Sequence, residues 1–281
     1  MRVLGIDVHP DLVEQWATWF APAAQPFLAD DELAAAVGGR EEELGDEVRD
    51  TFCLYGPPDG LRHVWLDEQA FLALPRLLRV RLVRAQLAHE RELVPTVRAW
   101  EHLVPRVREQ VDGHRFVWWP SLLEGVEEQV LTAYVEEGRR ASRHGDVPDE
   151  VWSRSADLLP GARRVAGTFP AASGPNCFGA VMAAAGVPGA DEVWMLREPF
   201  EEWLAARTRP GGRDDDPATV LVWRSPDGLV QHAAVTLGGG WALHKPSQGW
   251  MSPTKVLSVV ECRASSRANG RRLERRSLTA R

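Results

Sequence analysis

The chain has 281 residues, 44% of them hydrophobic and 12 of them tryptophan, which is enough apolar surface for a sizeable core in one or two domains. Its net charge of −7 and its pI near 5.7 argue against a nucleic-acid-binding body. We therefore expect no nucleic-acid partner. The sequence has no run of about 18 apolar residues, so we expect no membrane partner either.

The first residues and the cysteines indicate a compartment. Residues 1–7 are too short and too soon interrupted, by Asp7, to resemble a secretory signal. The three cysteines have no paired spacing, which agrees with a reducing environment. We therefore expect a cytoplasmic protein. No cysteine or histidine cluster has the spacing of zinc ligands, so we predict no metal and no cofactor.

The first half of the chain is predicted to be mainly helical after a short strand at 2–6. Helical periodicity and capping residues favour helices over 11–20, 30–37, 67–90, 94–111 and 121–142, with a strand-like run at 115–119. Pro148 and the turn at 158–161 indicate a boundary. We predict a helical N-terminal region of unknown role over 1–155 and a second domain over 156–281.

A cysteine in the second domain has the local setting that thiol chemistry requires. Turn formers precede Cys177, and a run of small residues closed by Gly186 follows it, so Cys177 is predicted to lie in the first turn of a helix. Aligned peptide dipoles and free amide groups at that position favour the thiolate.

Two histidines lie on a predicted β-hairpin further along the chain. His232 follows Cys177 by 55 residues and His244 follows His232 by 12. Each lies in a strand-like run, at 230–237 and 241–245, and the three glycines at 238–240 permit a tight reversal between them. In a regular hairpin the two histidines come close together, so that His232 can accept the thiol proton while His244 orients its ring.

These residues resemble the NlpC/P60 family of papain-like cysteine hydrolases. The resemblance rests on Asn176-Cys177-Phe178-Gly179 and on the segment from His232 to His244, and it covers about residues 160–262. It implies an α+β, papain-like fold with Cys177 as nucleophile, His232 as base and His244 as the third polar residue. It also implies an amidase or peptidase that acts on a small peptide or amide through an acyl-enzyme.

The residues beside the cysteine depart from the family pattern. The family commonly has aspartate before the cysteine and serine after it, where this chain has Asn176 and Phe178. We assign both positions, together with Trp241, to substrate binding. Cys53 and Cys262 have no comparable surroundings and are predicted to be structural.

Other functions stay open on the sequence. The same triad could pass the acyl group to an amine, as in an acyltransferase or transpeptidase. The departures beside Cys177 also fit a catalytically inactive papain-like module that binds a partner, because a buried cysteine in a helix of small residues is most often a packing residue. A structural or regulatory protein whose N-terminal helices bind a partner is a third possibility, and the oligomeric state is undetermined.

Overall fold

The computed structural model describes residues 1–56 and 59–279, and this part of the chain forms two compact units. The first unit comprises Met1 and Val8–Glu137, and the second comprises Arg2–Asp7 and the chain from Gly138 onward. No helix among the described residues is long and apolar enough to cross a membrane. Each unit mixes helices with sheet, as the predicted α+β class requires.

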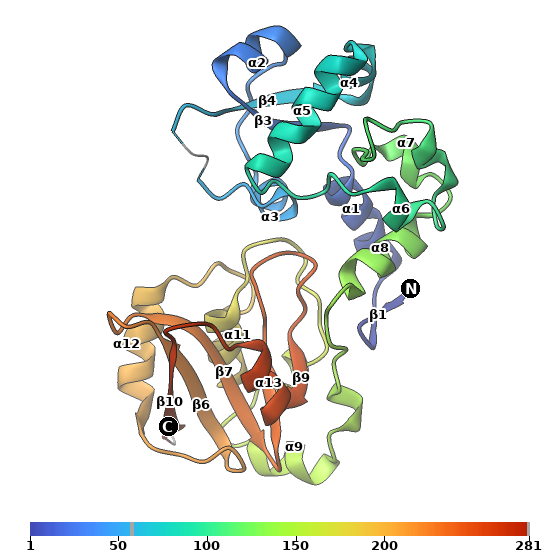
Figure 1. Cartoon of the computed structure of the whole chain (residues 1–281). Coiled ribbons are helices and arrows are strands. Elements are labelled where there is room, and N and C mark those ends of the chain that lie inside the picture. Colours follow the sequence, from blue (N-terminus) through green and yellow to red (C-terminus); the bar gives the residue numbers. More distant parts are fainter. Residues whose placement is uncertain (57–58, 280–281) are drawn as a thin grey trace. The chain divides into compact units, whose positions relative to one another are not determined.

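The first unit packs short helices around a two-stranded antiparallel sheet, β3 and β4 (Figure 1). Its elements are α1 (Pro10–Phe20), β3 (Ala24–Ala29), α2 (Asp31–Val37), α3 (Asp46–Phe52), β4 (Arg62–Asp67), α4 (Glu68–Ala73), α5 (Arg76–Ala88), α6 (Val97–Trp100), η1 (Pro105–Arg108), α7 (Pro120–Leu123) and α8 (Glu127–Glu136). Phe27 of β3 pairs with Val64 of β4, and both lie in an apolar core with Phe71, Leu82 and Trp119.

The predicted helices of this unit are partly wrong. The helix expected over 67–90 is two helices, α4 and α5, because Pro75 interrupts it. Over 94–111 only α6 and η1 form, and the run at 115–119 contributes no strand. Apolar residues of that run are nevertheless buried, and the Gln25 side chain satisfies the Trp118 carbonyl at 2.7 Å. The apolar pattern at 115–119 therefore indicates buried side chains and not a strand.

The second unit is built on a six-stranded antiparallel sheet with the strand order β5-β10-β6-β7-β8-β9. Its elements are β1 (Arg2–Val3), β2 (Ile6–Asp7), η2 (His144–Asp146), α9 (Asp149–Ser155), α10 (Ala162–Val165), α11 (Cys177–Ala184), α12 (Arg197–Arg207), β5 (Thr208–Pro210), β6 (Pro217–Arg224), β7 (Val230–Gly238), β8 (Trp241–His244), β9 (Lys255–Ser258), α13 (Val259–Ser265) and β10 (Arg272–Leu278). The strand expected at 2–6 is instead the β1–β2 hairpin.

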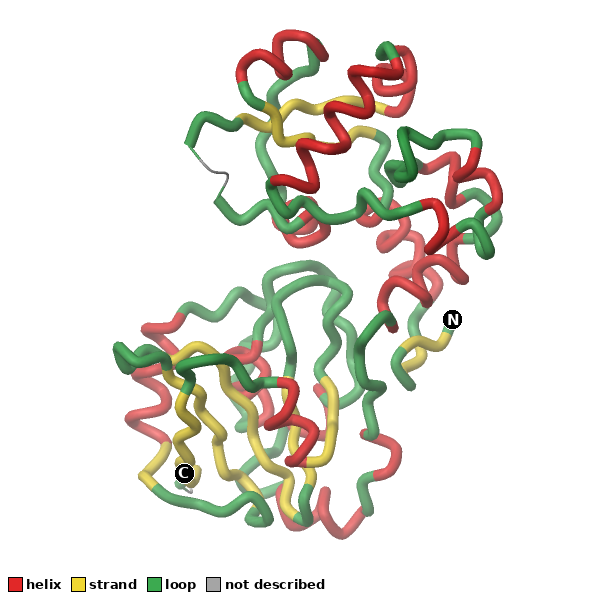
Figure 2. Tube along the Cα trace, viewed as in Figure 1, coloured by secondary structure: helices red, strands yellow, loops and turns green. Residues whose placement is uncertain are grey.

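The two faces of this sheet carry different helices (Figures 1 and 2). On β7, Ala233, Val235 and Leu237 point into the main core, to which α9, α10, α11 and α12 contribute. Their neighbour Ala234 points to the other face, where it packs in a smaller cluster with Val259 and Cys262 of α13. This alternation follows from the two-residue period of a strand and assigns each side chain of β7 to one face.

The boundary between the units lies near Gly138 rather than after residue 155. The segment between these positions supplies Val147, Val151 and Trp152 to the main core of the second unit. Helix α9 contacts β7 and β6. The turn at 158–161, which suggested the later boundary, thus lies inside the second unit, between α9 and α10, and α10 packs on α11.

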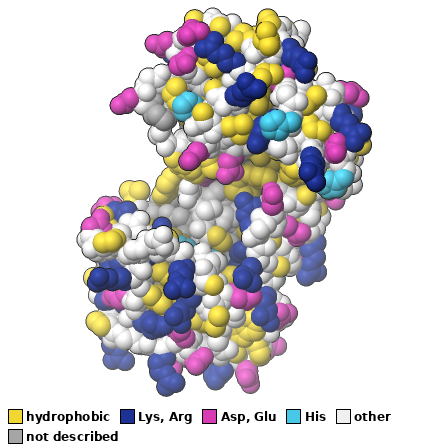
Figure 3. Space-filling view, in the orientation of Figure 1, with side chains coloured by type: hydrophobic (Ala, Val, Ile, Leu, Met, Phe, Trp, Pro, Cys, Tyr) yellow, Lys and Arg dark blue, Asp and Glu magenta, His cyan; other side chains and the backbone are white. Residues whose placement is uncertain are grey.

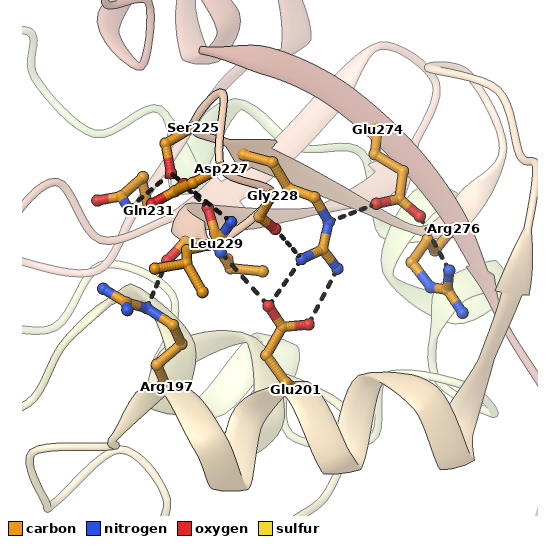
Figure 4. A network of polar contacts seen from close by, with 11 residues as sticks. Arg197, Glu201, Ser225, Asp227, Gly228, Leu229, Gln231, Glu274 and Arg276 are labelled. Carbon is orange, nitrogen blue, oxygen red and sulfur yellow. Dashed lines mark hydrogen bonds and ion pairs between the residues drawn. The ribbon is translucent and has the colours of Figure 1, made fainter.

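Polar contacts fasten α12 to the sheet (Figure 4). Arg224 of β6 donates to both carboxylate oxygens of Glu201 on α12, at 2.7 and 3.0 Å, and to Glu274 of β10 at 2.7 Å. Arg276 donates to the other oxygen of Glu274 at 2.9 Å. The hydrogen bonds to Glu201 raise the pKa of Arg224, while the partial burial of these groups acts to lower it. The arginine-rich C-terminal segment is therefore a strand inside the sheet.

Candidate active site

Cys177 is the first residue of α11, as predicted. The preceding residue, Asn176, caps the helix: its Oδ1 accepts hydrogen bonds from the amides of Phe178 and Gly179, at 3.0 and 3.2 Å. Its Nδ2 donates to the Met195 carbonyl at 2.8 Å. Both ends of the Asn176 amide are thus used to hold the start of the helix, which gives this residue a positioning role.

Opposing influences act on the Cys177 sulfur. Burial raises the pKa of the thiol to about 11, while backbone amides of Ala233, Cys177 and Phe178 and the charge of Lys245 act to lower it. The residue is 9% exposed, and a thiol with such a pKa is protonated at neutral pH. The contact with Ala233 places the sulfur against β7, one residue from His232.

The hairpin brings His232 and His244 together, as predicted. The pairs Val235↔Leu243 and Thr236↔Ala242 set the register of β7 and β8. The centroids of the two imidazole rings are 5.8 Å apart and the ring planes meet at 84°. The connection at 238–240 consists of three glycines with φ of 90°, 60° and 79°, values that side chains with a Cβ adopt at a cost.

Both imidazoles are neutral at pH 7 in this structure. His232 is 7% exposed and His244 is 1% exposed. Burial lowers the pKa of His232 to about 4 and that of His244 well below its usual value. Nε2 of His232 and both ring nitrogens of His244 are buried without a hydrogen-bond partner. A neutral imidazole is the form that can accept a thiol proton.

The predicted hydrogen bond between Cys177 and His232 is not formed in the described structure. Strand alternation assigns His232 and His244 to the face that carries α13, and His232 packs on Trp223 with ring centroids 5.3 Å apart. Cys177 belongs to the main core on the other face. The three residues therefore meet at one end of β7, with the two rings in contact and the sulfur against the adjoining backbone.

The structure places two predicted substrate contacts elsewhere. The ring of Phe178 is buried and stacks on Phe200 with centroids 4.5 Å apart, so its role is packing. Trp241 lies at the glycine turn opposite Gly238, at the end of the hairpin away from His232, and Arg143 lies over its ring at 4.7 Å. Asn176 borders a pocket of about 280 Å³.

Lys245 and Lys255 are residues that motif reasoning missed. They are the only two lysines in the chain, among 33 basic residues, and both are buried. Lys245 borders the same pocket as Asn176 and its ammonium donates to the Ser252 carbonyl. Arginine cannot release its proton in a protein, whereas a buried lysine can. The rarity of lysine was the signal that could have drawn attention to both positions.

Comparison of the chain with protein-family models, with curated proteins and with solved structures yielded no match. The chemistry of the site therefore has to be argued from its own geometry. Across residues 1–56 and 59–279 no group of three or more histidine, cysteine, aspartate or glutamate side chains is arranged to hold a metal ion.

We expect the free energy of unfolding to decrease as the pH falls from about 6.5 to about 4. An unfolded histidine titrates near pH 6.5, whereas His232 does so near 4, so protons bind the unfolded state first. The stabilisation is complete above pH 6.5, and its loss amounts to roughly 3 kcal/mol. Urea denaturation at pH 7 and pH 4.5 measures it. His232→Phe should reduce the dependence and leave the part that His244 contributes, since burial lowers the pKa of His244 as well; His114→Gln, at an exposed position, is the control.

Proposed function

We propose that the second unit is a papain-like cysteine hydrolase module of the NlpC/P60 type. One observation carries this proposal: the Cys177 sulfur, at the start of α11, lies against the backbone of β7, the strand that carries His232, and the ring of His232 contacts that of His244 on β8. A nucleophile at a helix start beside a strand that carries a base is the arrangement that thiol acyl transfer needs. The proposed substrate is a small peptide or amide in a reducing compartment, where three free cysteines are expected.

The proposed reaction begins with transfer of the Cys177 thiol proton to neutral His232. The thiolate attacks the carbonyl carbon, and the amide of Cys177 donates to the resulting oxyanion. When the tetrahedral intermediate collapses, the C–N bond breaks and His232 returns its proton to the leaving amine. Water then attacks the thioester, its proton passing through His232 to the departing sulfur. An amine in place of water would make the same site an acyltransferase.

Without substrate, Cys177 and His232 form no hydrogen bond, so we propose that substrate binding brings them together. Catalytic hydrogen bonds are often long or absent in unliganded enzymes and tighten in the substrate complex. The proposed reaction therefore requires substrate binding to move His232 away from Trp223 and bring one of its ring nitrogens to the sulfur, with the other nitrogen directed to His244. The unpartnered nitrogens of both rings favour such a rearrangement, because each would gain a hydrogen bond.

A second candidate is a catalytically inactive papain-like module that binds a partner. The observation that favours it is the protonated thiol, whose pKa near 11 is accompanied by no hydrogen bond to either histidine in the described part of the chain. In that case Cys177 is a packing residue of the main core. The two candidates differ in whether His232 activates the sulfur.

Labelling with iodoacetamide at pH 7, followed by intact mass and peptide mapping, separates them. For the hydrolase we expect Cys177 to react at least about tenfold faster than Cys262, which is also buried and has a pKa raised to about 12. We also expect His232→Ala to remove this advantage. Equal labelling of the two thiols, unaffected by His232→Ala, would establish the binding module. His63→Ala, in the first unit, is the control for loss of a buried imidazole nitrogen.

A further inference from the structure

His244 lines a second pocket, which has a volume of about 340 Å³. Its walls come from the end of β8, the loop that follows, β9, α13 and the segment that begins at Gly138, all within the second unit. Its charged lining residues are Arg139, Arg140 and Lys255, and none of the lining residues is acidic. Met251 and Leu257 add apolar surface. We call this cavity the Lys255 pocket.

Lys255 is the buried charge of this pocket. The residue is 4% exposed, and its ammonium donates one hydrogen bond, to the Arg140 carbonyl at 2.9 Å. An ammonium has three N–H groups, and no carboxylate in the described chain forms an ion pair with this one. A buried charge without a counter-ion is costly, so an anionic ligand would relieve the site.

His244, which lies beside Lys255 in the pocket wall, also lacks hydrogen-bond partners. His244 is directly opposite Lys255 in the β8–β9 pairing, so both side chains leave the sheet on the same face. Neither ring nitrogen of His244 has a hydrogen-bond partner, although a neutral ring carries one N–H. The protein therefore holds a cation and an unsatisfied imidazole side by side at one pocket.

The choice of lysine at this position adds weight to a ligand role. Both lysines are buried, so arginine provides almost all the basic surface of the second unit; Figure 3 shows the lysine and arginine side chains together in dark blue. A lysine ammonium is a compact point charge with three freely rotating donors, which suits one small anionic group in a confined space. Apolar walls around one buried cation fit an organic anion of single charge better than a phosphate dianion.

We propose that the Lys255 pocket binds the carboxylate group of a small organic ligand, with the Lys255 ammonium as counter-charge. The counter-charge in this inference is Lys255, and neither Cys177 nor His232 takes part; His244 lines the pocket and also belongs to the proposed triad. Arg139 and Arg140 raise the positive potential at the pocket, and Glu261 on α13 contacts Arg140 at 3.3 Å. Because Glu261 pairs with Arg140, Lys255 is the buried cation of the pocket to which the carboxylate is assigned.

Selective incorporation of [ε-¹³C]lysine tests the proposal, since two lysines give two NMR signals. Lys255→Arg identifies the signal of Lys255, and Lys245 is an internal control. We expect hexanoate to shift the Lys255 signal saturably and to raise the pKa of Lys255 above its value of about 8, which burial and the neighbouring arginines have lowered. Hexanamide, the neutral counterpart, should cause no such shift. Affinity for hexanoate should fall about tenfold between pH 7 and pH 9, as the ammonium loses its proton.

The outcomes are separable. Lys255→Met should abolish hexanoate binding, while Arg267→Met, at an exposed position outside the pocket, should retain it. No hexanoate-dependent shift of the Lys255 signal, or an equal effect of hexanamide, would overturn the proposal. A shift with inorganic phosphate and none with hexanoate would refute the carboxylate. Because these signals are read from the folded wild type, a Lys255→Met variant that fails to fold does not remove the test. Cys177→Ala protein should give the same result.

Discussion

Replacing Cys177 with alanine is expected to abolish amide hydrolysis while leaving the fold nearly unchanged. A serine protease that loses its nucleophile loses a factor of about 10⁶ in turnover, and we expect at least about 10⁴ here. The structural cost is small because the change deletes one sulfur atom at the edge of the main core, where the residue is 9% exposed. A loss of about 1 kcal/mol would lower the melting temperature by roughly 2–4 °C.

Cys262→Ala is the matched control for this substitution. It deletes the same atom from a buried position on the α13 face of the same sheet, where the sulfur has no part in the proposed reaction. We expect this variant to keep its turnover and to lose at least as much stability, because Cys262 is fully buried. Equal turnover in wild type and Cys177→Ala would exclude a thiol nucleophile. A collapse in the stability of Cys177→Ala would instead mark Cys177 as a packing residue.

The histidine hairpin and the start of α11 could be predicted because their determinants are local. Three glycines between two apolar strand-like runs permit few arrangements, and the register they impose brings His232 and His244 together. Asn176 before a run of small residues is likewise a short-range signal, and the structure shows its side chain capping two amides. Contacts between residues close in sequence are the ones that a pattern can report.

The relation between the cysteine and the histidines could not be predicted in the same way. It depends on which face of β7 each side chain occupies, and a shift of one residue reverses that choice. Packing of α11 on one face and α13 on the other decides it, and these helices are separated by more than 70 residues. The insertion of β10 between β5 and β6 is equally long-range.

In the first unit, burial misled the helix prediction. Apolar residues at 94–111 are spaced as in a helix and those at 115–119 as in a strand, yet several of them are buried in irregular backbone. Pro95, Pro105 and Gly113 limit regular structure there, and side chains such as Gln25 satisfy the backbone in its place. Hydrogen bonds from distant side chains to the backbone follow no periodic pattern, so they cannot be predicted from the sequence.

Gly179→Ala is expected to destabilise the second unit strongly, although helix propensity alone predicts the opposite. Alanine is favoured over glycine in a helix by about 1 kcal/mol. A Cβ at Gly179 would, however, lie 2.1 Å from the carbonyl oxygen of Ala190 and 3.1 Å from its carbonyl carbon, and these are backbone atoms that cannot rotate away. Overpacking of this kind typically costs 1–3 kcal/mol and sometimes more, so we expect a net loss of about 2 kcal/mol or more and a displaced Cys177.

Urea denaturation of Gly179→Ala, compared with wild type and with Gly145→Ala, measures this effect. Gly145 has open space where a Cβ would be added, so the same chemical change there should alter the unfolding free energy by less than about 0.5 kcal/mol. The displacement of α11 should also change the iodoacetamide labelling of Cys177, which lies two residues before the substituted position. A Gly179→Ala protein as stable as Gly145→Ala would show that α11 does not pack against the Ala190 backbone, and the position assigned to the Cys177 sulfur would be wrong with it.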